Sequence, residues 1–218
     1  MFASQMEKII LKDPAMRAKY KGIYAKDTLP MLRHHGGYIA NTDESTDIGE
    51  HWVLVYLTQQ SLFFIDSFAE EPRYYGKEFE EWIESSSELV KIRRLTQPLQ
   101  HPHSHFCGLY VLYFFYYLSR HYPLDGILKS FSNNSLNNDR KVLSFAKKKF
   151  DNFKIIPLWG SGGSSSSSST GGGRVYIEHL KKDFSIYLST HNKYGMENVM
   201  PSKCFGGWKL RYRKINIC

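Results

Sequence analysis

Cysteine is scarce in this chain, whose 218 residues include three: Cys107, Cys204 and Cys218. Small secreted proteins that depend on disulfides contain an even number of closely spaced cysteines, so this chain does not belong to that class. Its first residues, MFASQMEKIILKDPAMRAKYKG, are too polar for the apolar core of a secretory signal. We therefore expect an intracellular protein that is not secreted and whose stability comes from an ordinary hydrophobic core.

Long hydrophobic runs are also missing. The longest, from Phe106 to Leu118, is shorter than the roughly 20 residues that span a bilayer. Its aromatic and aliphatic residues instead indicate a helix that is buried in the core. We expect a monomer without a membrane partner.

Net charge is nearly absent from most of the chain. Residues 1–173 contain 20 Lys and Arg against 18 Asp and Glu, whereas residues 174–218 contain 9 against 3. Between the basic segment and the rest lie residues 160–173, GSGGSSSSSSTGGG, a composition typical of a flexible, engineered linker. We predict a folded domain at residues 1–159, followed by this linker and by a basic segment at residues 174–218.

The pattern of residues 1–159 predicts an α+β fold with a central mixed β-sheet flanked by helices. β-branched and aromatic residues indicate strands, which we expect at 37–42, 51–57, 62–66 and 90–96, with the second and third forming a hairpin. Apolar residues at helical spacing indicate helices, which we expect at 76–90, 109–117 and 137–153. A further helix is expected to begin with Ser4 as N-cap and Glu7 completing a capping box.

Three histidines at alternate positions, His101, His103 and His105, precede Cys107. If these four residues lay on one face of a strand, neighbours would be about 6.6 Å apart and the set would spread over about 20 Å. A zinc ion needs its four ligands within about 2.3 Å. Only a loop could gather them, and Pro102 stiffens this loop. We therefore expect packed or solvated histidines and no metal site.

Cys107 is better explained as a nucleophile. It stands where a polar loop gives way to the apolar helix, and the dipole and free N–H groups of a helix N-terminus favour a thiolate. A thiolate needs a base, and the base needs an orienting acceptor. His51 at the start of one predicted strand and Asp66 at the end of its hairpin partner are residues of these types. Gln100, in the loop before Cys107, supplies a second donor for an oxyanion beside the Cys107 N–H.

The order of these residues resembles the adenovirus endopeptidase (adenain) group of cysteine proteases, distant relatives of the Ulp1-type SUMO proteases. The order is His51-Trp52, then an acidic residue and a phenylalanine after a hairpin, then the motif QxPxSxxCGL. Six residues form this motif here: Gln100, Pro102, Ser104, Cys107, Gly108 and Leu109. The similarity covers nearly all of residues 1–150, and a Maverick/Polinton element, an adintovirus or a virophage is a plausible source.

The resemblance implies a papain/adenain-like fold and a thiol endopeptidase with Cys107 as nucleophile and His51 as general base. It implies that Asp66 orients His51, at a position where adenain itself has Glu. It also implies that Gln100 and the Cys107 backbone bind the oxyanion, with support from the backbone of Trp52.

Members of this family cut viral capsid and core precursor proteins after Met/Ile/Leu-x-Gly-Gly or within Met/Ile/Leu-x-Gly-x↓Gly, because a narrow tunnel excludes side chains. The resemblance therefore implies a virion maturation protease, located in the virion and in the host nucleus or a cytoplasmic viral factory. The tail holds a candidate cleavage site at Gly206-Gly207↓Trp208, although Cys204 stands where an aliphatic residue is expected. The segment LWGSG at residues 158–162 is a second, weaker match.

Cleavage after Gly207 would release residues 208–218, WKLRYRKINIC, a short basic peptide. Adenain is activated by a peptide of this kind from a minor capsid precursor, so the resemblance implies a peptide cofactor. The apolar residues expected to contact the domain are Trp208, Leu210, Tyr212, Ile215 and Ile217. Their near-alternation with basic residues is typical of a strand that adds to an exposed sheet edge. Adenain secures its peptide by a disulfide, but residues 1–159 contain no cysteine except Cys107, so we expect non-covalent binding.

Two other functions stay open at this point. One is a deubiquitinase or deSUMOylase of the same clan, and the other is a non-catalytic capsid or DNA-binding protein. DNA is a candidate partner in either case, and its affinity should come mainly from residues 174–218 and fall steeply with salt. We expect no small-molecule cofactor.

Overall fold

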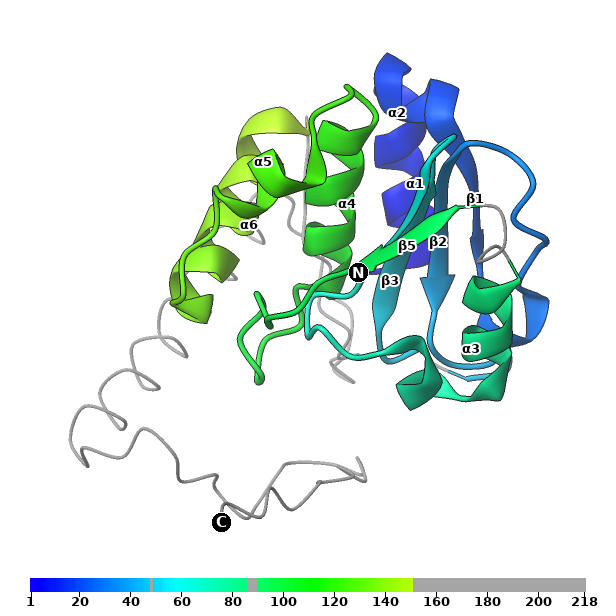
Figure 1. The fold of residues 1–218 in the computed structure, drawn as a ribbon. Coiled ribbons are helices and arrows are strands. Elements are labelled where there is room, and N and C mark those ends of the chain that lie inside the picture. The colour runs from blue at the N-terminus through cyan, green and yellow to red at the C-terminus, as the bar shows by residue number, and fades with distance from the viewer. Residues whose placement is uncertain (48, 86–89, 151–218) are drawn as a thin grey trace, which may run out of the picture. The chain divides into compact units, whose positions relative to one another are not determined.

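The computed structural model describes residues 1–47, 49–85 and 90–150, which form a mixed β-sheet with helices on both faces (Figure 1). Five strands in this described part follow the order β1-β2-β3-β4-β5, with bounds Tyr20–Tyr24, Gly36–Asn41, Trp52–Leu57, Ser61–Ile65 and Lys91–Arg94. The pairs β1–β2 and β4–β5 are parallel, whereas β2–β3 and β3–β4 are antiparallel. The predicted α+β class, mixed sheet and β3–β4 hairpin are confirmed.

Helices cover both faces of the sheet. Their bounds are α1 Ala3–Lys12, α2 Pro14–Lys19, α3 Lys77–Glu84, α4 Cys107–Leu118, α5 Leu124–Leu128 and α6 Ser135–Lys149, with 3₁₀ turns η1 at Lys26–Thr28 and η2 at Pro72–Tyr75. The predicted core helix is confirmed as α4, in which ten of the twelve residues are buried. Among the described residues, no helix is long and apolar enough to cross a bilayer.

Successive side chains of the central strands point to opposite faces of the sheet, which explains why the core has two layers. In β3, Leu54 and Tyr56 belong to the cluster around α1, α4 and α6, whereas Val53 and Val55 belong to the cluster around α3. Figure 1 shows α3 on one side of the sheet and α1 and α4 on the other. A strand buried on both faces is apolar at successive positions, which accounts for the run WVLVYL. The sheet centre is therefore buried on both faces, and the polar site residues lie in the loops at its ends.

The structure corrects several predicted boundaries. Ser4 is not the N-cap of the first helix, because α1 begins at Ala3 and the N–H of Phe2 is bound by Oε1 of Gln5 at 3.1 Å. The helix expected at 137–153 begins earlier, at Ser135, because the Asn134 side chain caps it. Strand β1 and helices α2 and α5 were not predicted.

Several predictions fall on residues that the structure does not describe. They are the domain boundary at 159, the linker at 160–173, the segment 174–218 and both candidate cleavage sites. The helices expected at 76–90 and 137–153 end earlier, at Glu84 and Lys149, and Phe150 is already extended.

Candidate active site

Cys107 is the first residue of α4 and is buried, with 7% of its surface exposed. At this position its backbone N–H has no acceptor within the helix. The His51 side chain and the backbone N–H of Trp52 are the donors whose effect on the sulfur favours the thiolate. Burial opposes a charged thiolate, but these two donors and the charge of His51 outweigh it and lower the pKa of Cys107.

His51 lies directly before β3, and its carbonyl accepts the N–H of Thr42 at 3.0 Å, which fixes it to the end of β2. Its Nε2 is 2.7 Å from Oδ1 of Asp66, so Nδ1 is the nitrogen left for Cys107. Burial disfavours the imidazolium, but Asp66 and Cys107 together raise the pKa of His51 to about 10. Both shifts favour a thiolate–imidazolium pair over a neutral thiol and imidazole.

Two aromatic rings hold the His51 imidazole in plane. The Phe68 ring is stacked at a centroid distance of 5.0 Å and the Tyr75 ring at 5.8 Å. Trp52, the next residue, donates its indole N–H to the carbonyl of Met1 at 3.0 Å. These contacts restrict rotation of His51, and so they keep both ring nitrogens on their partners.

Asp66 follows β4 and is almost fully buried. Besides His51, its oxygens accept three hydrogen bonds: from the N–H of Phe68 at 3.0 Å, from the N–H of Glu70 at 3.0 Å and from the hydroxyl of Tyr75 at 2.6 Å. Burial and the neighbouring Asp66 carboxylate raise the pKa of Tyr75, which keeps it a donor. The carboxylate therefore has one orientation, with Oδ1 directed at His51.

Gln100 is buried in the segment between β5 and α4. Its Nε2 donates to the carbonyl of Ser104 at 2.8 Å, and its Oε1 accepts the hydroxyl of Ser67 at 2.7 Å. Within the described residues, its side-chain hydrogen bonds go to these two serines and not to Cys107. The structure thus places Gln100 under the loop that leads to Cys107, and its role as an oxyanion donor stays a prediction.

A polar cluster from α4 and α6 supports this loop, and no motif in the sequence indicated it. The carbonyl of Leu99 accepts the Tyr110 hydroxyl at 3.0 Å and the Asn138 side chain at 3.1 Å. Asp139 is fully buried, accepts the Tyr110 hydroxyl at 2.8 Å and has its pKa raised by burial. Because these contacts satisfy the loop backbone, they fix the approach to Cys107.

The histidines before Cys107 and the glycine after it also have defined surroundings. His101 and His103 have ring centroids 5.6 Å apart, and the described residues contain no group of three metal-ligating side chains. A Cβ on Gly108 would lie 3.1 Å from Cβ of Met1 and 3.4 Å from Sδ of Met6. The close packing at Gly108 therefore involves methionine side chains.

The sequence-predicted residues Cys107, His51 and Asp66 are thus brought into one hydrogen-bonded series, and the Trp52 backbone joins it. Such a series presents a nucleophile, a proton carrier and an orienting carboxylate, which is the arrangement required for acyl transfer.

No family model and no curated protein sequence matches the chain. Among solved structures, it is similar to ChlaDub1 from Chlamydia trachomatis, with 18% identity over 45% of this chain and 46% of that chain, at a TM-score of 0.36. It is similar to the central domain of Lpg1148 from Legionella pneumophila, with 12% identity over 66% and 97% of the chains, at a TM-score of 0.36.

The SUMO protease Ulp1, solved with its catalytic cysteine oxidised to a sulfonic acid, is a third similar structure. Its identity is 18% over 50% of this chain and 51% of that chain, at a TM-score of 0.29. This chain therefore spans about half the length of the ChlaDub1 and Ulp1 chains that it matches.

Proposed function

We propose that this protein is a cysteine endopeptidase with Cys107 as its nucleophile. The observation that carries the proposal is the buried series from Cys107 through His51 to Asp66, with the sulfur at the N-terminus of α4. Isolated histidine–aspartate pairs are common structural features. A buried thiol whose pKa is lowered by that pair is typical of a catalytic site.

The geometry supports a two-step acyl transfer. The Cys107 thiolate attacks the scissile carbonyl carbon, a C–S bond forms, and the carbonyl electron pair moves to oxygen, where the Cys107 N–H and Gln100 stabilise it. His51 then gives its proton to the leaving amine as the C–N bond breaks. In the second step, His51 takes a proton from water, the resulting hydroxide attacks the thioester, and the thiolate leaves.

For substrate class, we favour viral precursor proteins cut after Gly-Gly or Gly-x motifs, within a virion or viral factory. Support comes from the motif order around Cys107 and from the Gly206-Gly207↓Trp208 sequence in the same chain. The second candidate is a deubiquitinase or deSUMOylase, which the same nucleophile and base would serve equally well.

One assay separates these candidates. Fluorogenic Leu-x-Gly-Gly peptides, ubiquitin conjugates and SUMO conjugates are incubated with the full chain under identical conditions. The maturation-protease proposal predicts turnover of the peptides, with the bond after the second glycine cut, and little turnover of either conjugate. Preferential turnover of ubiquitin or SUMO conjugates would assign the protein to the second class.

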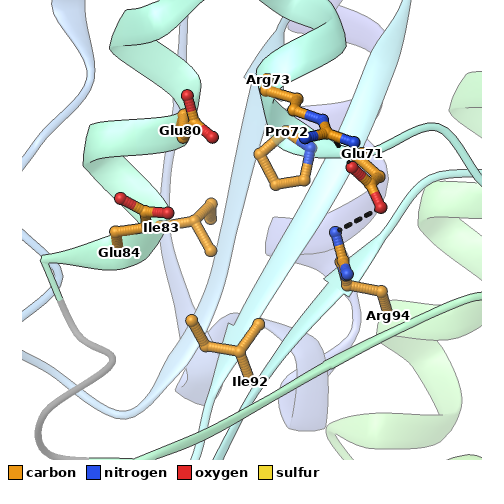
Figure 2. A pocket seen from close by; sticks show the side chains of 8 residues that line it. All are labelled: Glu71, Pro72, Arg73, Glu80, Ile83, Glu84, Ile92 and Arg94. Atoms are coloured by element: carbon orange, nitrogen blue, oxygen red, sulfur yellow. Dashed lines mark ion pairs between the residues drawn. The ribbon is translucent and has the colours of Figure 1, made fainter.

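We further propose that residues 208–218 are an activating peptide. A pocket of about 430 Å³ beside the edge strand β5 supports this, with Ile83 of α3 and Ile92 of β5 in its wall (Figure 2). Glu71 there forms ion pairs with Arg73 and Arg94, at 2.7 and 3.3 Å. Two more carboxylates on α3, Glu80 and Glu84, also line the pocket. Two isoleucines beside three carboxylates and two arginines suit a strand of alternating apolar and basic residues.

A further inference from the structure

Ser67 follows Asp66 directly and is almost fully buried. Its carbonyl and its hydroxyl both bind the segment that precedes Cys107. Its carbonyl accepts the N–H groups of Leu99 at 2.9 Å and Gln100 at 3.0 Å, and its hydroxyl donates to Oε1 of Gln100 at 2.7 Å. One residue thus holds both the backbone and the side chain of Gln100.

The hydrogen-bond partners of Gln100 admit one orientation of its carboxamide. The carbonyl of Ser104 can only accept, so it must face Nε2, which donates to it at 2.8 Å. A flipped amide would set Oε1 against that carbonyl, with two acceptors facing each other. The Ser67 hydroxyl, donating to Oε1, fixes the opposite end of the same group. An amide nitrogen carries two hydrogens, and Ser104 uses one.

We infer that Ser67 is a positioning residue, which holds the carboxamide of Gln100 so that its second N–H is available to the oxyanion. This inference rests on the proposed protease function. Because Asp66 and Ser67 are consecutive, one short turn after β4 orients the base through Asp66 and the oxyanion donor through Ser67.

The kinetic test uses the full chain and a Leu-x-Gly-Gly peptide. Removing one oxyanion donor lowers kcat by about 100-fold or more. A donor that is still present but less firmly positioned should lower kcat by a smaller factor. We expect roughly a tenfold loss in kcat for Ser67→Ala with KM unchanged, since the oxyanion exists only after attack. Ser67→Thr keeps the hydroxyl and should retain more of kcat. The control is Ser119→Ala, which removes a buried hydroxyl bound to the carbonyl of Tyr116 and should leave kcat unchanged.

A double-mutant cycle separates positioning from general structural support. If Ser67 acts through Gln100, then Ser67→Ala should have no further effect on kcat in a Gln100→Ala background. Additive losses would overturn the inference, as would a wild-type kcat in Ser67→Ala. Thermal unfolding of each variant is followed in parallel, and Ser67→Cys, a weaker donor of similar shape, replaces Ser67→Ala if the latter does not fold.

A second measurement does not depend on activity. Hydrogen exchange of the Gln100 side-chain amide, followed by NMR and assigned with Gln100→Ala, should be slow in the wild type and faster in Ser67→Ala. Equal exchange in the two proteins would overturn the inference even if the protein is a protease. An inactive wild type with slow, Ser67-dependent exchange would instead refute the proposed function, and with it the catalytic purpose of this contact, while leaving the hydrogen bond itself demonstrated.

Discussion

At the scale of single residues, the site depends on two buried charges, the Cys107 thiolate and the His51 imidazolium. Burial alone would raise the pKa of Cys107 and lower the pKa of His51, which penalises both charges. The thiolate and the imidazolium stabilise each other. The Asp66 carboxylate also stabilises the imidazolium, and three further donors hold that carboxylate in place.

The reactivity of Cys107 towards iodoacetamide should extend to lower pH than that of an ordinary thiol. Its pKa is lowered, so the thiolate persists as pH falls below the usual thiol range, and the His51 pKa of about 10 keeps the imidazolium as pH rises. In His51→Ala, burial is no longer offset by the imidazolium, so the pKa of Cys107 should rise above its ordinary value and alkylation at neutral pH should slow. The measurement is the alkylation rate against pH in a Cys204→Ser/Cys218→Ser background. Superimposable profiles for the two proteins would contradict the ion pair.

Gln100 offers a second test at this scale. We expect Gln100→Ala to lower kcat by about 100-fold with little effect on KM, because the lost hydrogen bond exists only in the tetrahedral state. Gln97→Ala, an exposed position in the same segment, is the matched control. Steady-state kinetics decides the matter, since a purely structural Gln100 would leave kcat of the folded variant near the wild-type value.

At the scale of secondary-structure elements, the site is built where β3, β4 and α4 end or begin. His51 precedes β3, Asp66 follows β4 and Cys107 opens α4. Helix α4 packs on the sheet closely enough that a Cβ on Gly37 of β2 would lie 2.7 Å from the Phe115 ring. The absence of a side chain at Gly37 therefore sets the distance between helix and sheet.

Gly37→Ala should destabilise the protein by about 1–3 kcal/mol, because the added methyl group overpacks this interface. Chemical denaturation followed by fluorescence gives the free energy of unfolding. Gly126→Ala in α5 is the control, since its Cβ would lie 3.3 Å from its nearest neighbour, Cγ of Pro123, and alanine favours a helix. Phe115→Leu should restore part of the stability in the Gly37→Ala background, and equal stabilities of the two alanine variants would refute the packing argument.

The sequence predicted the elements whose patterns are local. Strands β3 and β4 are apolar and joined by a short turn, and the change from polar loop to apolar helix marks Cys107. Strand β1, YKGIY, carries only a weak pattern and owes its place to parallel pairing with β2. Ser67, Asn138 and Asp139 could not be predicted as site neighbours, because only tertiary folding brings the turn after β4 and the start of α6 to the segment before α4.

At the scale of the whole molecule, the proposed activation couples the tail to the domain. In the full chain, Trp208→Ala/Tyr212→Ala should lower peptide hydrolysis, since it removes apolar contacts of the proposed strand, and free 208–218 peptide should restore it. Glu80→Gln/Glu84→Gln should weaken this restoration, whereas Glu81→Gln should not, because Glu81 pairs with Lys77 and does not line the pocket. Activity that is unaffected by the two tail substitutions would show that residues 208–218 are no cofactor.

The central claim is that Cys107 is the nucleophile, and the most direct measurement is peptide hydrolysis by Cys107→Ala beside the wild type. The wild type should hydrolyse Leu-x-Gly-Gly peptides and, with a Gly-Gly vinyl sulfone, gain one adduct that mass spectrometry places on Cys107. Cys107→Ala should unfold as cooperatively as the wild type, show no turnover and form no adduct. Hydrolysis by Cys107→Ala at the wild-type rate would contradict the account.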